Sequence, residues 1–385
     1  MEMMNSLSQN KSTGVLENLF GMKGGHEDSS YAKNSSVQLM IVEAAKPILE
    51  RGIYENLKLN FNGGAIVRIA DLGCGTGWNT LVVADRIVKA VQSIVEEGNK
   101  REFEVYFNDL ASNDFNSLLR ILPPLGHDSG DADGGRKPVA TRSYYAAAVS
   151  GSYFKRLFPR KSLNFCHSSF SLHYLSRVPE SVEQKSSPRV YISSDCDEAV
   201  GAAYLHQFEK DITAFLSARA EEMVGGGCMF TLQCGRKSGS NIMKEQGTFG
   251  DISRHLEYAF EDLVIEGIIK KEKWETFNMP WFATNSEEME SIVKKEDSFS
   301  VITVRVLEGF PLHSITQVKE GEEEMFGRSV ENQYRAMFEK VVGTHLGCEH
   351  LTNEFFSRIA KRATAKFKEY LEDKVELVVS FLVRK

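Results

Sequence analysis

The sequence predicts an α/β fold in which a Rossmann-like, mostly parallel sheet of seven strands carries an α-helical cap. Two observations lead to this prediction. Through residue 235, five short apolar runs alternate with helical segments, which is the order of repeated βαβ units. Further along, runs of alternating polarity at 299–307 and 375–383 are separated by helical segments. Such a late pair of strands completes the sheet with one antiparallel strand, and the extra helices can cover the strand ends.

A glycine-rich turn follows the first predicted strand, which ends at Leu72. Gly73, Gly75 and Gly77 form a G-x-G-x-G pattern, and Asp71 stands two residues before the first glycine. Because glycine has no Cβ atom, a ligand can lie against the backbone of this turn, at the strand end where open α/β sheets bind ligands. The turn is therefore predicted to hold a cofactor.

The spacing of acidic residues indicates the kind of cofactor. Dinucleotide sites need G-x-G-x-x-G and an acid about 20 residues further on, whereas the next strand-end acid here, Asp109, lies much further downstream. No Gly-Lys-Ser or Gly-Lys-Thr follows the glycines, which disfavours a phosphate-binding P-loop. The arrangement resembles that of class I S-adenosylmethionine-dependent methyltransferases, in which the acid after the second strand binds the ribose hydroxyls.

The remaining elements are predicted from hydrophobic periodicity and turn residues. Strands are expected at 66–72, 103–107, 144–149, 163–166, 228–233, 299–307 and 375–383. Helices are expected at 37–49, from the glycine turn to about 97, from 114 over a short distance, and at 197–223, 252–269, 286–295, 330–344 and 352–370.

These elements divide the chain into a core and a cap. Residues 1–20 are expected to be a flexible N-terminus, and 21–235 a methyltransferase α/β core with an N-terminal active-site segment. The helical cap is assigned to 236–297 and 310–372, with 298–309 and 373–385 returning to the core sheet. The segment 123–138, rich in Gly, Asp and Pro, is expected to be a mobile surface loop.

Composition narrows the classes of partner. The net charge of −7 and the absence of a Lys/Arg block disfavour nucleic acid as a partner, so small molecules are expected instead. The polar start of the chain and the lack of a run of 18 apolar residues lead us to expect a cytoplasmic protein that does not bind membranes. Six scattered cysteines without C-x-x-C support neither a zinc nor a disulfide framework.

Several motifs together resemble the plant SABATH methyltransferases, the family of salicylate and benzoate carboxyl methyltransferases and theobromine synthase. They occur in family order from residue 20 to the end of the chain. The matching segments are 22–25 (MKGG), 30–38 (SYAKNSSVQ), 69–74 (IADLGC), 108–110 (NDL), 113–116 (NDFN), 151–159 (GSYFKRLFP), 175–179 (LSRVP) and 277–280 (FNMP).

The resemblance implies binding of S-adenosylmethionine, with S-adenosylhomocysteine as the product. Asp109 would accept the ribose hydroxyls, Leu110 would lie against the adenine, Ser152 would bond the edge of the adenine and Tyr153 would stack on it. The cofactor residues implied by the family motifs, together with the first glycine of the turn, are Tyr31, Ser35, Asp71, Gly73, Asn79, Asp109, Leu110, Ser152 and Tyr153.

The resemblance also implies a pocket for a small acid. Gln38 would donate to the acceptor carboxylate, and Tyr174 stands where the family usually has a tryptophan that donates to the second oxygen. The substrate residues implied are Lys23, Gln38, Phe170, His173, Tyr174, Ile252, Ser253 and Met337. Because a tyrosine is smaller than a tryptophan, we expect an acceptor bulkier or less planar than salicylate.

The activity implied is methylation of the carboxylate of a small plant metabolite to a methyl ester, with Gln38, Tyr174 and His173 as the catalytic residues, in an enzyme expected to be a homodimer. A carboxylate, with a pKa near 4, needs no base at neutral pH. The alternative is N-methylation of a purine-like or alkaloid substrate, for which His173 would act as the base. His173 has two other interpretations, a substrate contact or a core residue, and a silent binding protein is a third functional class.

Some family members bind a cation beside the segment that includes Glu275, Phe277 and Asn278. This chain has Glu275 where those members have an aspartate, and Ser186 or Ser187 where an asparagine is typical. The sequence therefore leaves open whether Mg²⁺ binds at Glu275, Phe277 and Asn278.

Overall fold

The computed structural model describes residues 21–58, 66–95, 101–126, 141–183 and 189–385. The predicted N-terminal segment 1–20, most of the predicted loop at 123–138, and Ser186 and Ser187 lie outside these residues. Within the described part of the chain, no helix combines the length and the apolar character needed to cross a membrane.

Seven strands form one sheet with the order β3-β2-β1-β4-β5-β7-β6. The pairs from β3 to β5 are parallel, and β7 runs antiparallel to both of its neighbours, β5 and β6. The strands are β1 (Ile66–Leu72), β2 (Glu102–Asp109), β3 (Tyr145–Ser150), β4 (Leu163–Ser169), β5 (Met223–Cys234), β6 (Phe299–Pro311) and β7 (Lys374–Arg384). The predicted seven-stranded sheet with one antiparallel strand is confirmed.

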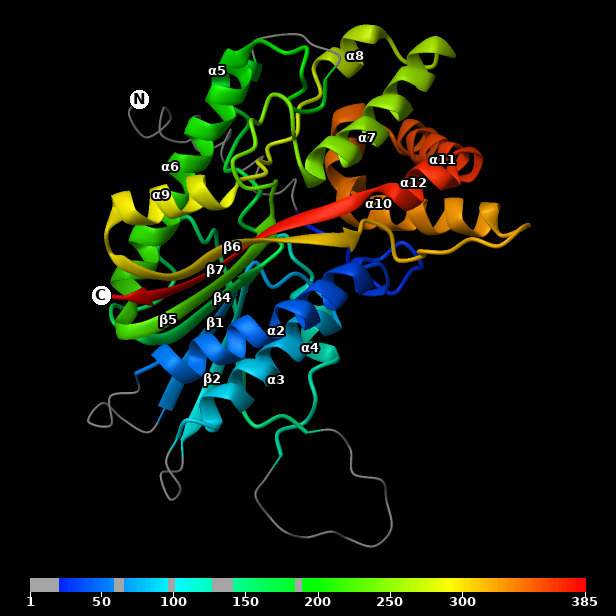
Figure 1. Ribbon diagram of the computed structural model, residues 1–385. Helices are drawn as coiled ribbons and strands as arrows, with labels where there is room; N and C mark the ends of the chain where they lie inside the picture. Colours follow the sequence, from blue (N-terminus) through cyan, green and yellow to red (C-terminus); the bar gives the residue numbers. More distant parts are fainter. Residues whose placement is uncertain (1–20, 59–65, 96–100, 127–140, 184–188) are drawn as a thin grey trace, which may run out of the picture.

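Helices cover both faces of this sheet. On one face lie α2 (Ser36–Asn56) and α3 (Trp78–Gln92), and on the other α6 (Glu198–Glu222) and α9 (Ser286–Glu296) (Figure 1). The short elements of the core are the 3₁₀ helix η1 (Tyr31–Lys33), α4 (Phe115–Arg120) and α5 (Glu180–Glu183). Although α9 falls in the segment assigned to the cap, it packs against β6 and α6, because its buried face continues the helical layer over the sheet.

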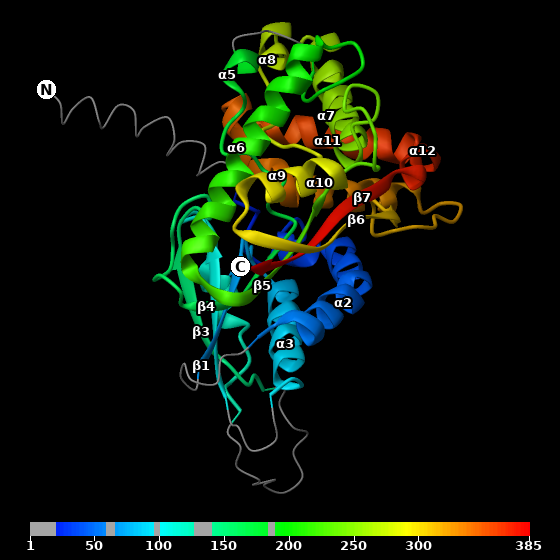
Figure 2. The ribbon, with the colours of Figure 1, turned by 60° about the vertical axis from the view of Figure 1, so that its left-hand side comes forward.

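The remaining helices form the cap beyond one end of the sheet (Figure 2). They are α7 (Thr248–Ile265), α8 (Lys271–Glu275), α10 (Glu323–Leu346), α11 (Glu349–Ala365) and α12 (Phe367–Glu372). The helix predicted at 352–370 is divided into α11 and α12 at Lys366, and α10 begins seven residues before the predicted helix at 330–344. β6 and β7 extend from the sheet into the cap, so the last two strands belong to both parts (Figure 1).

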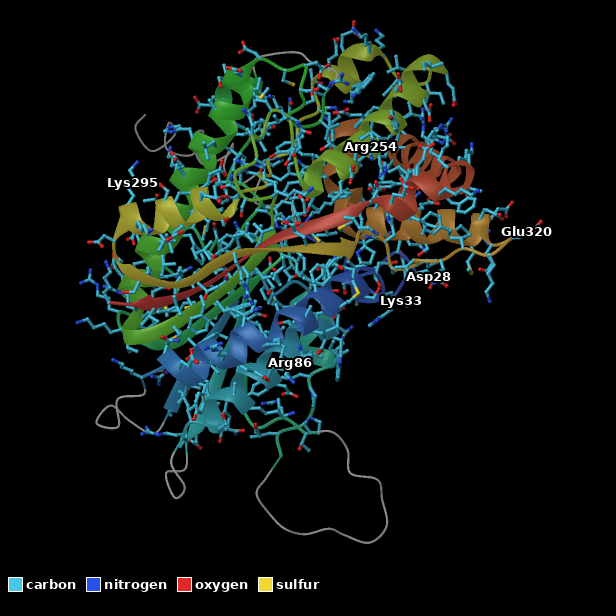
Figure 3. The ribbon with its side chains drawn as sticks, in the orientation of Figure 1. Asp28, Lys33, Arg86, Arg254, Lys295 and Glu320 are labelled. Atoms are coloured by element: carbon cyan, nitrogen blue, oxygen red, sulfur yellow. The ribbon has the colours of Figure 1, made fainter. Side chains whose placement is uncertain are left out.

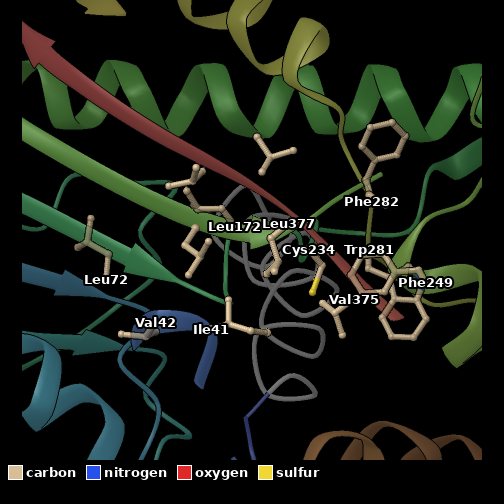
Figure 4. Close-up of a cluster of buried hydrophobic side chains, with 14 of the residues drawn as sticks. Ile41, Val42, Leu72, Leu172, Cys234, Phe249, Trp281, Phe282, Val375 and Leu377 are labelled. Carbon is tan, nitrogen blue, oxygen red and sulfur yellow. The ribbon is translucent and has the colours of Figure 1, made fainter. Parts of the chain in front are cut away.

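The core continues from the sheet into the cap without a break. Ile41, Leu72 and Leu172, beside the sheet, belong to the same buried cluster as Phe249 and Trp281 near the cap (Figure 4). The rings of Phe249 and Trp281 are stacked with their centroids 4.4 Å apart. Charged side chains such as Asp28 and Lys33, which form an ion pair of 2.8 Å, lie on the outside (Figure 3).

A buried ion pair at the end of α6 holds the loop after β3. Arg219 and Glu222 are fully buried and 2.7 Å apart. Arg219 also donates to the peptide oxygens of Tyr153 and Lys155, each at 2.9 Å, and Glu222 accepts the N–H of Phe158 at 3.0 Å. Because each charge is satisfied by its partner and by this loop, the pair fixes the loop backbone against the core.

We predict that Glu222→Gln destabilises the protein by roughly 3–5 kcal/mol, because it leaves the buried guanidinium of Arg219 without a counter-charge. The free energy of unfolding would be measured by urea denaturation. The matched control is Glu221→Gln, one residue earlier, where the carboxylate pairs with Arg156 and Arg160 at the surface. Equal losses in the two variants would show that the buried pair does not anchor the loop.

Candidate active site

The glycine turn after β1 has a backbone that only glycine adopts readily. Gly73 and Gly75 have φ angles of 75° and 61°. At Gly73 a Cβ atom would also lie 2.4 Å from the Cβ of Ser171, so even alanine would force the two segments apart. The N–H groups of Gly73 and Cys74 both donate to the peptide oxygen of Asn108, at 2.8 and 2.9 Å. The turn is thus bent tightly over the end of β2.

The side chain of Asn108 extends this arrangement to β3. Its Nδ2 atom donates to the peptide oxygens of Val149 and Gly151, at 2.9 Å each, and the residue is fully buried. The ends of β1, β2 and β3 are therefore tied together by one residue. They carry the glycine turn, Asp109 and the loop with Ser152 and Tyr153.

Asp109 lines the resulting cavity. One carboxylate oxygen accepts the N–H of Gly75 and the other accepts the N–H of Leu110, both at 2.7 Å. Burial raises the pKa of Asp109 to about 6, and the two N–H donors oppose this rise because they stabilise the ionised form. Each oxygen keeps further acceptor capacity, which suits a ligand with two neighbouring hydroxyl groups.

A cavity of about 320 Å³ opens at these strand ends. Eight of the nine predicted cofactor residues line it: Tyr31, Asp71, Gly73, Asn79, Asp109, Leu110, Ser152 and Tyr153. The ninth, Ser35, acts from behind, because its peptide oxygen accepts Nδ2 of Asn79 at 2.9 Å. Residues from η1, β1, α3, β2 and the loop after β3 thus converge on one concave site.

Tyr153 is fixed by a hydrogen bond and by ring packing. Its hydroxyl donates to the peptide oxygen of Ser171 at 2.9 Å, and its ring packs edge-on against Phe154 and Phe215. The ring is therefore held rigidly at the cavity wall, where a planar heterocycle could pack against it.

A chain of polar contacts deeper in the cavity was missed by the sequence analysis. Asp71 lies 2.7 Å from Nδ1 of His167, and Nε2 of His167 lies 2.7 Å from the hydroxyl of Ser169. Thr80 donates to the other oxygen of Asp71. The signal that could have found His167 is the sheet order, because β1 and β4 are neighbours and Asp71 is in register with His167.

Gln38, Phe170 and Tyr174, which the sequence assigned to the substrate, also line the cavity. The amide oxygen of Gln38 is buried and has no hydrogen-bond partner among the described residues. Phe170 adopts a φ angle of 57°, a strained value for a non-glycine residue, while its N–H donates to the peptide oxygen of Leu232 at 2.7 Å. Three of the eight predicted substrate residues therefore meet the predicted cofactor residues in one cavity.

The other five predicted substrate residues do not line this cavity. Lys23 pairs with Glu339 of α10 at 2.9 Å, and its N–H donates to the peptide oxygen of Ala336, next to Met337. Ile252 and Ser253 are buried in α7. These four residues lie on or against the cap, and Ser253 lines a separate pocket.

His173 is the fifth residue, and it lies behind Tyr174. Its ring is buried between Tyr174 and Phe249, with centroids 4.6 and 5.2 Å away. Nδ1 accepts the N–H of Cys234 at 3.3 Å, and burial lowers the pKa of the imidazole to about 3. The ring is therefore neutral at physiological pH, with its Nδ1 lone pair directed at a backbone donor.

The segment considered for Mg²⁺ offers few ligand groups. Glu275 binds the ammonium group of Lys271 at 2.9 Å, so its carboxylate already has a cation. The ring of Phe277 is buried against Phe260 and His345, and Asn278 is half-buried. This set does not resemble the cluster of oxygen ligands that Mg²⁺ requires.

Comparison with known proteins identifies the family. The family model for SAM dependent carboxyl methyltransferases matches residues 17–385. Indole-3-acetate O-methyltransferase 1 of Arabidopsis thaliana is 37% identical over 370 residues, covering 92% of this chain and 92% of the relative. The Coffea canephora protein named "Probable caffeine synthase MTL2" is 35% identical over 369 residues, covering 90% of this chain and 92% of the relative.

A solved structure gives the same result. Loganic acid methyltransferase with SAH superimposes with a TM-score of 0.78 and 30% sequence identity, over 94% of this chain and 98% of that chain. Fold, motifs and cavity therefore agree in assigning S-adenosylmethionine as the cofactor. The chain belongs to the SAM-dependent carboxyl methyltransferase family, the plant SABATH methyltransferases.

Proposed function

We propose that Gln38 and Tyr174 hold the carboxylate of a small plant acid against the sulfonium methyl group of S-adenosylmethionine, which this carboxyl methyltransferase transfers to give a methyl ester. The observation that carries the proposal is the position of Gln38. Its side chain lines the same cavity as Asp109 and the glycine turn. The amide nitrogen is a suitable donor to a carboxylate oxygen.

The transfer step needs alignment rather than acid or base chemistry. A lone pair of the carboxylate oxygen forms the new O–C bond, the C–S bond breaks, and its electron pair goes to sulfur. No proton moves, because the acid is already ionised at neutral pH. An anion and a cation become two neutral products, so an apolar wall such as Phe170 favours the reaction. Holding the oxygen about 3 to 3.5 Å from the methyl carbon contributes roughly 7–11 kcal/mol.

The surroundings of His173 support carboxyl methylation over the N-methylating alternative. A purine N–H would have to lose a proton, and the base proposed for this was His173. Its Nδ1 accepts the N–H of Cys234, its pKa is lowered to about 3 by burial, and the residue does not line the cavity. Such a ring is a poor proton acceptor for a substrate. Xanthines enter the experiment below because one relative is named for caffeine synthesis.

The proposal also includes an oligomeric state and a cellular location. We expect a homodimer, on the basis of the family resemblance, and size-exclusion chromatography with light scattering would measure the assembly. We expect a cytoplasmic location, on the basis of the polar start of the sequence, and a fluorescent fusion in plant cells would report it.

The proposed function predicts that radiolabelled S-adenosylmethionine yields methyl esters from a panel of carboxylic acids, and that Gln38→Ala loses most of this activity. Loss of a hydrogen bond to a charged group costs about 1.5–3 kcal/mol, or roughly ten- to more than a hundredfold in kcat/KM. Mild base distinguishes esters, which hydrolyse, from N-methyl products.

The affinity of the Gln38→Ala variant for S-adenosylhomocysteine should equal that of the wild type, because Gln38 would touch only the acceptor. Gln92→Ala, at the exposed end of α3, is the matched control with full activity expected. Label retained after base treatment with xanthines, and none with acids, would contradict carboxyl methylation. An equal loss of cofactor affinity would contradict the role of Gln38.

Tyr174 is expected to set the shape of the acceptor. Tyr174→Trp restores the larger wall usual in the family, so kcat/KM for flat acids such as benzoate should rise relative to bulkier acids. A change of about 1–3 kcal/mol in discrimination corresponds to roughly 10- to 200-fold. Tyr258→Trp, on the surface of the cap, is the control. Unchanged ratios across the acid panel would show that residue 174 does not select the acceptor.

The raised pKa of Asp109 predicts a pH-dependent affinity for the cofactor. Ribose hydroxyls donate to the ionised carboxylate, and protonation as the pH falls through about 6 removes that acceptor. The affinity for S-adenosylhomocysteine, measured by calorimetry, should therefore fall roughly tenfold between pH 7.5 and pH 5.

The control for the pH profile is Asp109→Asn. This variant should bind more weakly at every pH, and its affinity should no longer fall across this range. A slope that persists in the variant would assign the titration to another group in the cavity.

A further inference from the structure

Three buried side chains meet at the junction of cap and sheet, away from the methyl-transfer cavity. They are His255 of α7, His313 from the connection between β6 and α10, and Asp373, which precedes β7. Their exposed fractions are 3%, 3% and 6%, and one nitrogen or oxygen atom of each lies within 4.8 Å of the others. None of the three lines the cavity that contains Gln38 and Asp109.

The distances between these atoms match those around a small metal ion. Oδ2 of Asp373 lies 3.3 Å from Nε2 of His255 and 3.5 Å from Nε2 of His313. A tetrahedral zinc ion with bonds of about 2.0–2.1 Å to nitrogen and oxygen separates its ligand atoms by roughly 3.3–3.4 Å. The carboxylate oxygen is thus spaced from each of the two nitrogens as ligands of one ion are, and all three atoms lie within 4.8 Å of one another.

The hydrogen bonds of Gln333 determine which nitrogen of His313 faces Asp373 as an acceptor. Nε2 of Gln333 donates to the peptide oxygen of Leu312 at 2.7 Å, so its amide oxygen faces His313. Nδ1 of His313, 3.2 Å from that oxygen, must carry the hydrogen. Nε2 of a neutral His313 then directs its lone pair at the carboxylate of Asp373. Two buried acceptors that face each other with no donor between them are destabilising, and a metal ion between them would satisfy both.

The remaining hydrogen bonds in this cluster do not involve Nε2 of His313 or Oδ2 of Asp373. Arg254 binds Oδ1 of Asp373 at 3.3 Å, and Nδ1 of His255 lies 2.6 Å from the hydroxyl of Tyr334. Among the described residues, Nε2 of His313 and Oδ2 of Asp373 are buried without a hydrogen-bond partner. Outer contacts of this kind, which orient each ligand by its far atom, are typical of metal-binding histidines and carboxylates.

We propose that His255 Nε2, His313 Nε2 and Asp373 Oδ2 bind a divalent ion of the zinc type at the base of the cap. Two imidazoles and one carboxylate suit zinc better than Mg²⁺ or Ca²⁺, which prefer oxygen ligands alone. The ion joins α7, the β6–α10 connection and the start of β7, and so fixes the cap on the sheet. The site is distinct from Glu275, Phe277 and Asn278, and its ligands are too far apart in sequence to form a recognisable motif.

The full-length protein would be stripped of metal and titrated with Zn²⁺ and with Co²⁺. We expect about one ion per chain, visible absorption bands of a cobalt ion in a low-symmetry site, and a higher thermal midpoint with Zn²⁺. A wild-type chain that binds neither ion, with a midpoint that metal does not change, would overturn the proposal. The occupant would then be a proton between His313 and Asp373.

Variants locate the ion. Asp373→Asn and His313→Gln should each lose the cobalt bands and the zinc-dependent rise in the midpoint. The matched control is His345→Gln, because His345 is a partly buried cap histidine bonded to the peptide oxygen of Lys273. This control should bind as the wild type does. Equal metal binding in the two ligand variants would place the ion elsewhere and contradict the assignment, and a variant that fails to fold leaves the wild-type titration decisive.

Discussion

The active site depends on one buried residue that ties three strand ends together. The peptide oxygen of Asn108 accepts two N–H groups of the glycine turn, and its side chain donates to the backbone at Val149 and Gly151. The glycine turn, Asp109 and the loop after β3 all start from these strand ends. Four hydrogen bonds therefore set the distances between these three parts of the cavity wall. Such preorganisation favours cofactor binding, since little ordering is left to occur when the ligand arrives.

The loop after β3 is also fixed by the buried ion pair at the end of α6. Arg219 and Glu222 bind the backbone at Tyr153, Lys155 and Phe158 while they neutralise each other. Two charges without exposure are tolerated only because each has several partners. The segments that carry Asp109 and Tyr153 are therefore short and fixed by hydrogen bonds. Phe170, in another part of the cavity wall, has a strained backbone.

The seven-stranded, mostly parallel sheet was predicted correctly, because it follows from local patterns along the chain. Gly73, Asp71 and Asp109 stand at strand ends, and parallel strands bring such residues to one edge of the sheet. His167 was missed, since its partnership with Asp71 depends on the neighbouring position of β1 and β4. His173 had three interpretations, as a base, a substrate contact or a core residue, and it is buried among aromatic rings and bonded to a backbone donor, contacts that have no local signal.

Four of the predicted substrate residues lie on or against the cap, and none of them lines the cavity: Lys23, Ile252, Ser253 and Met337. Lys23 binds Glu339 of α10, and the buried cluster joins Ile41 beside the sheet to Phe249 near the cap. An interaction that fixes the cap on the sheet, as the proposed metal ion at His255, His313 and Asp373 would, therefore stabilises the packing between cap and sheet without touching the residues that line the cavity.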